Sequence, residues 1–410
     1  MNDKFYSNAN IVTKLPHKKD VELLDKINQY EANSMQGQIP LVWDKAHGFI
    51  VEDRHGNRFI DFTSGICVAN CGHGNPEIAD AIAKQTSKPL LHSYTFGTEI
   101  RYKFLKELVD TCYPNGKAFL VSAGTEATEV ACKLMKMYNK RTMLMSFTGA
   151  MHGRTSLAEQ LKGDYTWAVN DNHVWHFSFP KPEETWEDII RFVNTHFIDN
   201  CAGIIIESYQ GWSAQFYPKQ YIKDLVKWAK QRKILVCFDE IQGGFGRTGR
   251  MFAYEHYGID KPDLICFGKG ISSSVPLSGV MGKKDILDTP KVGSMSSTHS
   301  ANPISCAAGL ANLRYILDNN LIERSEELGH IMFDYLENKL KLRVEGHGLL
   351  CAIHTETEKE ADRIVMECFK KGLLLIRTHR KSVKLAPPLV ITPEALIEGL
   401  KIIESVIKKR

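Results

Sequence analysis

Short, continuous apolar runs alternate with helix-like segments through the middle of the chain, and this alternation constrains the fold more than any other feature. The apolar runs occupy residues 118–121, 143–145, 204–206, 234–238 and 264–267. Segments with helical periodicity lie before and between them, at 76–88, 98–111 and 125–138. A strand without polar alternation is buried on both faces. The pattern therefore predicts an α/β architecture, in which helices cover a mostly parallel sheet.

The two ends of the chain have a different pattern. Residues 41–63 indicate a small antiparallel meander with strands at 41–43, 49–51 and 58–62. Further predicted elements are helices at 302–318, 320–342 and 393–408 and strands at 349–353, 373–376 and 383–386. We expect both ends to pack together as one smaller α+β domain. The predicted division is 1–65 and 305–410 for the two parts of the small domain and 66–304 for the large domain.

Composition excludes several classes of protein. Hydrophobic residues make up 43% and charged residues 24% of the 410 residues, as in an ordinary globular protein. The formal net charge of +4 is too close to balance to indicate a nucleic-acid partner. No apolar run reaches the roughly 18 residues of a membrane span, and the N-terminus shows no signal-peptide core. The ten cysteines are scattered singly, which favours reduced thiols in a cytoplasmic protein.

Ligands of parallel sheets bind outside the carboxyl ends of the strands, so the residues after each apolar run are informative. Gly124 and Thr125 follow one run at a helix start, where free N–H groups suit a phosphate. The alternative is simple helix capping by Thr125. Asp239 ends another run, and a carboxylate there is costly to bury unless a cation meets it. The glycine-rich loop 243–249 is similar to a dinucleotide loop, but no helical pattern follows at once.

Two more features stand beyond the last runs. Lys269 lies between two glycines, either as a nucleophile that forms a Schiff base or as a lysine that extends its amine to solvent. The hydroxyl-rich loop around Thr298 could bind a phosphate or could only cap the next helix. A phosphate cradle, a buried carboxylate and a strand-end lysine are together the parts needed to hold pyridoxal phosphate. We therefore expect this cofactor.

The motifs then resemble those of the class III (ω-amino-acid type) aminotransferases of pyridoxal phosphate fold type I. Residues 239–249, DEIQGGFGRTG, are similar to the family's DEVQTGFGRTG, and residues 262–270 are similar to its PD…GK(A/G). Further matches are 70–76 to NxGHxHP, Thr298 with 302–303 to T..GNP, and 386–389 to the closing PPL. The resemblance extends from about Leu41 to the last helix. It implies a large domain whose sheet has seven strands.

The resemblance also implies roles for the residues around the cofactor. Lys269 would form the Schiff base and then move a proton between the substrate and the cofactor, and Asp239 would pair with the pyridinium nitrogen. Gln242 would lie near the ring hydroxyl. The other implied cofactor contacts are Gly124, Thr125, Met151, His152, Glu207, Ile241 and Thr298. Thr298 would reach the phosphate from the partner subunit, which implies a homodimer with shared active sites.

The substrate pocket is implied to contain Ile66, Arg154, Trp212 and Lys384, and the chain departs from the family pattern there. Arg154 matches a position that binds a substrate carboxylate, and its alternative is a structural ion pair. Trp212 stands where glutamate-using members have an acid, and Lys384 stands where they have an arginine. Met151 replaces an aromatic residue that would stack on the cofactor ring. These departures predict a specialised pocket for which at least one substrate is not a simple dicarboxylate, such as a carbon-ring amine, an amino sugar or a hydrophobic amine.

We predict an aminotransferase that moves an amino group from an amine or amino-acid donor to an oxo acceptor, with Lys269 as the covalent residue. An alternative is a racemase, epimerase or aminomutase of the same group, because these reactions need the same lysine and carboxylate. A second alternative is a nucleotide-binding or non-catalytic scaffold protein, against which the intact Lys269 and Asp239 argue. We expect small-molecule substrates, neither a nucleic acid nor a membrane as partner, and no metal.

Overall fold

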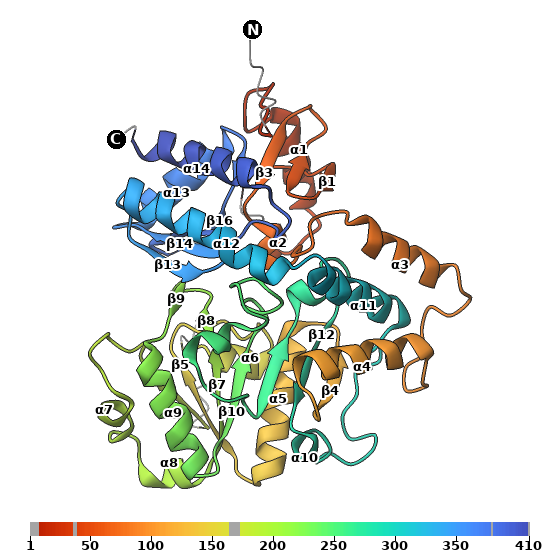
Figure 1. The fold of residues 1–410 in the computed structure, drawn as a ribbon, viewed down its shortest axis with the longest axis vertical. Coiled ribbons are helices and arrows are strands. Elements are labelled where there is room, and N and C mark those ends of the chain that lie inside the picture. Colours follow the sequence, from red (N-terminus) through yellow and green to blue (C-terminus); the bar gives the residue numbers. More distant parts are fainter. Residues whose placement is uncertain (1–7, 36–38, 164–172, 379, 409–410) are drawn as a thin grey trace.

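The computed structural model describes residues 8–35, 39–163, 173–378 and 380–408, and a seven-stranded sheet forms its centre (Figure 1). The strand order is β4-β12-β11-β10-β7-β5-β6. The strands are β4 (Lys117–Val121), β5 (Met143–Phe147), β6 (Val174–Phe177), β7 (Cys201–Glu207), β10 (Leu235–Asp239), β11 (Leu264–Phe267) and β12 (Ser278–Gly282). Neighbours are parallel except beside β12, which is antiparallel to both β4 and β11. The predicted mostly parallel sheet is confirmed.

The sequence pattern missed two strands of this sheet. β6 is short, and a single neighbour, β5, pairs with it at the sheet edge. β12 contains Gly279 and Gly282, which lower its apparent strand propensity. Both glycines are needed there. An added Cβ at Gly279 would lie 2.6 Å from the Phe119 carbonyl oxygen, and one at Gly282 would lie 2.3 Å from the Asp263 carbonyl oxygen. The two glycines that lower the apparent strand propensity of β12 are therefore the residues that let the neighbouring strands approach it.

Helices cover the sheet and its edges. The helices predicted at 76–88, 98–111, 125–138 and 302–318 are confirmed within two residues as α3 (Pro76–Thr86), α4 (Glu99–Cys112), α5 (Gly124–Asn139) and α11 (Pro303–Asp318). Helix α9 (Lys219–Gln231) was not predicted from the sequence. Shorter helices are α6 (Ser156–Gln160), α7 (Trp186–Ile190), α8 (Thr195–Asp199) and α10 (Lys284–Leu287). The apolar face of α5 is fully buried at Ala131 and Met135, within a cluster that includes Ile205 and Val280 of the sheet. Helix α5 therefore begins at the carboxyl end of β4 and lies along the sheet.

The two ends of the chain lie side by side (Figure 1). β1 (Lys45–His47), β2 (Ile50–Glu52) and β3 (Arg58–Asp61) form an antiparallel meander, and β15 (Leu373–Leu374) adds to β3 in parallel. The first strand was predicted at 41–43 and lies at 45–47 instead, because the tight turn at Gly48 (φ +55°) sets the register with β2. The boundaries of the two predicted domains stay a prediction.

The C-terminal part also carries a second sheet in the order β13-β14-β17-β16. Its strands are β13 (Val344–His347), β14 (Leu350–His354), β16 (Ile376–Arg377) and β17 (Ser382–Leu385). The helices of this part are α12 (Leu321–Phe333), α13 (Glu358–Phe369) and α14 (Pro393–Ile407). The helix predicted over 320–342 is wrong in its second half, where the chain changes from α12 to a π-helical turn at Asp334–Lys339. Two short strands, β8 (Tyr209–Gln210) and β9 (Gln215–Phe216), pair beside the central sheet.

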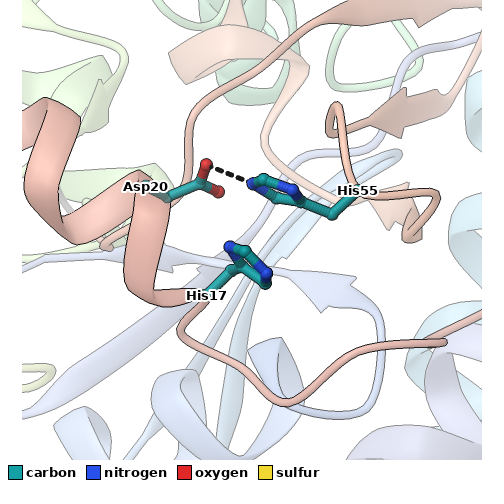
Figure 2. A group of neighbouring side chains, drawn as sticks. All are labelled: His17, Asp20 and His55. Carbon is teal, nitrogen blue, oxygen red and sulfur yellow. Dashed lines mark hydrogen bonds and ion pairs between the residues drawn. The ribbon is translucent and has the colours of Figure 1, made fainter.

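His17, Asp20 and His55 fasten the first helix, α1 (Lys18–Ile27), to the turn between β2 and β3 (Figure 2). The buried Asp20 Oδ1 lies 2.8 Å from His55 Nε2, and the two imidazole rings stack with centroids 3.5 Å apart at 22°. Side-chain ligand atoms of the three residues lie within 4.8 Å of one another. Nearly parallel rings favour stacking and a hydrogen bond over shared coordination of one metal ion. These contacts therefore attach the N-terminal segment to the turn between β2 and β3.

Candidate active site

A cavity of about 260 Å³ lies at the carboxyl ends of the central strands and contains most of the predicted site residues. Predicted residues that line it are Ile66, Met151, Arg154, Glu207, Trp212, Asp239, Ile241, Gln242, Lys269 and Lys384. The cavity is also lined by Gly211, Ile376, Arg377 and Thr378, which were not predicted from the sequence as site residues. The cavity thus joins strand ends of the central sheet to β16 and β17 of the C-terminal part.

Asp239 is the last residue of β10, and its buried carboxylate is held on both sides. Asp239 Oδ2 lies 2.8 Å from His152 Nδ1, and Oδ1 accepts a hydrogen bond from the Ile241 N–H at 3.0 Å. His152 is buried in turn, and its Nε2 lies 3.3 Å from Ser146 Oγ on β5. A carboxylate that is fixed in this way can face a cation in the cavity without an arginine or lysine beside it.

Lys269 follows β11 and turns its backbone into the left-handed region, with φ +44°. This conformation is unfavourable for a residue with a side chain and is typical of functional sites. The glycines on both sides fit closely: an added Cβ would lie 2.7 Å from Ser278 Oγ at Gly268 and 2.4 Å from Asn70 Nδ2 at Gly270. The glycines around Lys269 therefore let this turn pack tightly while its amine enters the cavity.

Gly124 and Thr125 lie next to the cavity rather than in its wall. They form the first turn of α5, and an added Cβ on Gly124 would lie 3.0 Å from the side chain of Ile241, which does line the cavity. Thr125 Oγ1 accepts hydrogen bonds from the N–H groups of Arg154 and Thr155 at 3.2 and 3.1 Å. Glu126 accepts from the N–H groups before the helix, so the first N–H groups of α5 itself stay available for an anion.

Glu207 ends β7 and ties together two loops of the cavity. Its carboxylate accepts hydrogen bonds from the Met151 N–H at 2.8 Å and from the Gly211 N–H at 3.0 Å. Burial raises the pKa of the Glu207 carboxyl above its ordinary value. Glu207 therefore orders the loop that carries Met151 against the loop that carries Gly211.

Lys384, on β17, is buried at the back of the cavity. Its Nζ donates to the Gly211 carbonyl at 2.5 Å and to Gln242 Oε1 at 2.8 Å. Burial lowers the pKa of the Lys384 amine to about 8. Because Lys384 occupies the Gln242 carbonyl oxygen, the amide NH₂ of Gln242 is oriented as the donor toward its surroundings.

Ile66 and Arg154 stand at more open positions of the cavity. Ile66 belongs to a turn, α2 (Ser64–Cys67), in which all four residues have positive φ, and its own φ is +65°. A β-branched residue in that conformation is rare and points to a functional constraint. Arg154 is 69% exposed, and its guanidinium lies 3.8 Å from Glu159. At that distance the ion pair is weak, so Arg154 keeps the freedom to meet a substrate.

Trp212 is fixed by a hydrogen bond from its Nε1 to the Thr378 carbonyl at 3.0 Å. Thr298, in contrast, is exposed and is not among the residues that line the cavity. Its carbonyl lies 2.8 Å from His92 Nε2, on another surface segment. The structure therefore gathers the other predicted residues in or beside one cavity and leaves Thr298 apart from it.

Comparisons with known proteins identify the family of the chain. A family model described as aminotransferase class-III matches residues 31–407. The 4-aminobutyrate aminotransferase of Mycobacterium tuberculosis is 30% identical, with 96% of each chain covered. The ornithine aminotransferase of Emericella nidulans is also 30% identical, covering 94% of this chain and 90% of its own. An alanine/serine racemase of Pyrococcus horikoshii is 30% identical as well, covering 97% and 92%.

The fold is shared with solved structures of the same group. An ornithine aminotransferase of Toxoplasma gondii, described with partial occupancy of pyridoxal phosphate at its active site, has a TM-score of 0.85 and 26% identity over 96% of each chain. The cavity fits this cofactor, since it combines the Lys269 amine, the Asp239 carboxylate and the nearby amino end of α5. The chain belongs to the class III aminotransferases, which transfer amino groups with pyridoxal phosphate as their cofactor.

Proposed function

We propose that Lys269 is the covalent and proton-moving residue of this aminotransferase and that Asp239 holds the positive charge of the cofactor ring. The single observation that carries the proposal is that both side chains line one cavity, with Asp239 fixed by His152 at 2.8 Å. The donor is an amine or amino acid, and the acceptor is an oxo compound.

The residues of the site have separate roles in the reaction. The bound cofactor supplies an electron sink for the negative charge that develops on the substrate carbon. Lys269 Nζ removes the proton from that carbon and would deliver it to the cofactor, as amino transfer requires. Asp239, held by His152, would face the protonated ring nitrogen, and Gln242 would donate its amide to the ring hydroxyl. The first turn of α5 would bind the phosphate.

The experiment that tests this proposal is a donor panel on the purified holoenzyme. 4-Aminobutyrate, ornithine and acetylornithine are included because related proteins carry their names, together with ring amines and hydrophobic amines. Each donor is added without an oxo acid, and the visible absorbance of the bound cofactor is followed. Loss of this absorbance with release of one oxo product supports amino transfer. A protein that binds the cofactor and reacts with none of the donors would contradict it.

Racemisation is the second candidate, because one relative is an alanine/serine racemase. It needs the same lysine and carboxylate, so the site does not distinguish the two reactions. An enantiopure amino acid incubated without an oxo acid distinguishes them. Formation of the mirror-image amino acid with no oxo product would favour a racemase, epimerase or aminomutase.

We also propose a homodimer with shared active sites. Thr298 lies outside the cavity of its own chain, in keeping with a contact to the partner's cofactor. Large apolar side chains are exposed on segments near it: Leu91 (53%), Phe96 (77%) and Val292 (107%). Tyr94 OH on the first segment donates to Ser296 Oγ on the second, at 3.2 Å, so the two segments form one surface. Light scattering that returned the 46.4 kDa monomer mass would refute the dimer.

The remaining proposals concern domains and location. We propose a large domain of residues 66–304 and a small domain of residues 1–65 and 305–410, supported by the pairing of β3 with β15. We propose a cytoplasmic protein, supported by the ten cysteines, each of which is a buried free thiol. Within the described part of the chain, none of the helices combines the length and the apolar character that crossing a membrane requires.

A further inference from the structure

Lys384 differs from the other cations of the active-site cavity in how completely the protein surrounds it. Among the described lysines and arginines that line this cavity, Lys384 alone is buried, with 4% of the residue exposed. Its strand, β17, lies between β14 and β16 in the second sheet. Its Nζ lies 5.5 Å from the centre of the Tyr209 ring, whose face attracts a cation. The side chain therefore reaches from the C-terminal part of the chain to the loops that follow β7 and β10.

Two acceptors in those loops bind the Lys384 amine. Its Nζ donates to the Gly211 carbonyl at 2.5 Å and to Gln242 Oε1 at 2.8 Å. A charged lysine amine has three N–H donors, and a neutral one keeps two. Burial lowers the pKa of the amine to about 8. Because two donors are enough for two acceptors, both hydrogen bonds can persist when the amine loses its proton.

The contact with Lys384 decides the orientation of the Gln242 amide. A charged lysine amine only donates, so the carbonyl end of the amide faces Lys384 and the NH₂ end faces away from it. The carbonyl end is also close to the backbone of Gly211, where an added Cβ would lie 2.7 Å from Gln242 Oε1. Gln242 Nε2 forms no hydrogen bond to the residues that the structure describes. Since Gln242 lines the cavity, its NH₂ group is a donor that is available there.

The loop that carries Gly211 is held in place as well. The Gly211 N–H donates to Glu207 Oε1 at 3.0 Å, and the other oxygen of Glu207 accepts from the Met151 N–H at 2.8 Å. Lys384 thus connects Gln242 to a loop that is tied to the end of β7. The orientation of the Gln242 amide is therefore fixed by the protein before any ligand enters the cavity.

We infer that Lys384 is a positioning residue, which holds the Gln242 amide so that its NH₂ group faces the ring hydroxyl of the bound cofactor. This inference rests on the proposed function, in which Gln242 donates to that hydroxyl, and it adds Lys384 to the site. The family resemblance implies a substrate-binding residue at position 384 instead. The two roles are distinguishable, because a positioning residue affects every amine donor, whereas a substrate anchor affects only donors that carry a carboxylate.

The first test is a pH titration of the visible absorbance of the bound cofactor, with no substrate present. A donor to the ring oxygen stabilises its ionised form and so lowers the pKa of this titration. Lys384→Met and Gln242→Leu should each raise that pKa by about one unit, the size of one charge-assisted hydrogen bond. The double variant should match Gln242→Leu, because no amide is left for Lys384 to position. The matched control Lys227→Met, on the exposed side of α9, should titrate as the wild type does.

Two results of the titration would overturn the inference. If Lys384 acted through its charge alone, Lys384→Met would shift the pKa equally with and without Gln242, and the two shifts would add. The variant Gln242→Glu leaves Lys384 in place, so it gives an answer even if Lys384→Met fails to fold. A carboxylate can accept from Lys384 but cannot donate to the ring oxygen, so the pKa should rise by about one unit or more. An unchanged pKa would show that Gln242 is not the donor.

The second test compares the best carboxylate-bearing donor of the panel with its analogue that has a methyl group in place of the carboxylate, such as 4-aminobutyrate and butylamine. Lys384→Met should lower kcat for both donors by about the same factor, roughly tenfold, and should change KM little. A higher KM that is confined to the carboxylate donor would make Lys384 a substrate anchor and overturn the inference, while the proposed function stands. If no donor of the panel reacts, the proposed function fails, whereas the absorbance titration still decides the role of Lys384.

Discussion

The buried amine of Lys384 should make the stability of this protein depend on pH in the alkaline range. Burial lowers the pKa of Lys384 from 10.5 to about 8 in the folded protein, whereas the unfolded chain keeps the ordinary value. Between these two values, the unfolded state binds more protons than the folded state. The free energy of unfolding therefore rises with pH in this window, because a growing share of the folded molecules no longer carries a buried charge.

The size of the effect follows from the two pKa values. A difference of about 2.5 units corresponds to roughly 3 kcal/mol in total, of which about 1 kcal/mol appears between pH 7 and pH 9. The variant Lys384→Met keeps a similar side-chain length and has no titrating group. Subtracting the stability of the variant from that of the wild type cancels the contributions of the other titrating residues.

The assay is urea unfolding of both holoenzymes at several pH values, at a fixed cofactor concentration. The free energy of unfolding of the wild type minus that of Lys384→Met should rise by about 1 kcal/mol from pH 7 to pH 9. Lys227→Met, which replaces an exposed lysine on α9, serves as the matched control and should give a difference that does not change with pH. A constant difference for Lys384→Met would show that the amine is not desolvated, and the geometry of the cavity wall would then be wrong.

Four further changes test other parts of the structure. Lys269→Ala should lower turnover by several orders of magnitude with an unchanged circular dichroism spectrum, since it removes the covalent and proton-moving group; wild-type turnover would refute the assignment. Asp239→Asn should retain the cofactor in equilibrium dialysis but lose most of the rate, because an amide carries no charge to hold a protonated ring nitrogen. Arg247→Leu should lower the free energy of unfolding by about 3 kcal/mol or more, since it strands several buried acceptors; a loss below about 1 kcal/mol in urea would contradict this. Asp20→Asn should lower the free energy of unfolding by about 1 kcal/mol, detectable as a lower Tm, because it weakens the contact with His55. It should leave kcat unchanged, because this contact lies outside the active site.

The elements that depend on local pattern were the ones that could be predicted. The helix starts at Pro76 and Pro303 follow asparagine caps whose side chains accept the first N–H groups, and such signals are visible in the sequence. Continuous apolar runs in turn marked the central strands. β12 was missed because its glycines serve the packing of its neighbours, and a contact of that kind is not visible in a local pattern.

The buried arginine of the glycine-rich loop shows a second limit of sequence reasoning. In sequence, the loop 243–249 is similar to a dinucleotide loop. In the structure, the Arg247 guanidinium donates to the Leu349 carbonyl at 3.1 Å, to Asn70 Oδ1 at 2.7 Å and to Ser64 Oγ at 3.1 Å. These partners lie 102 to 183 residues away in the chain. The loop therefore packs against the protein itself, and this follows only from the three-dimensional fold.

The cavity wall from Ile376 to Thr378 was also beyond prediction, because β16 has two residues and no pattern of its own. Arg377 lies in this wall, where an arginine can bind a carboxylate. Its guanidinium instead pairs with both oxygens of Asp362 at 2.6 Å, so this charge is committed to α13. A side chain in the wall of a cavity is available to a ligand only if its own hydrogen-bond and ion-pair partners do not already occupy it.

The hydrogen-bond partners of Lys384 also matter, because a lysine stands here where the glutamate-using members of the family have an arginine. An arginine would offer a carboxylate two parallel N–H groups, whereas a lysine amine has three donors in all. Two of these already bind the Gly211 carbonyl and Gln242, so one is left for a substrate. Arg154, exposed and loosely paired with Glu159, is the more available cation at the cavity. A small dicarboxylate would therefore find one good anchor near Arg154 and one weak contact at Lys384.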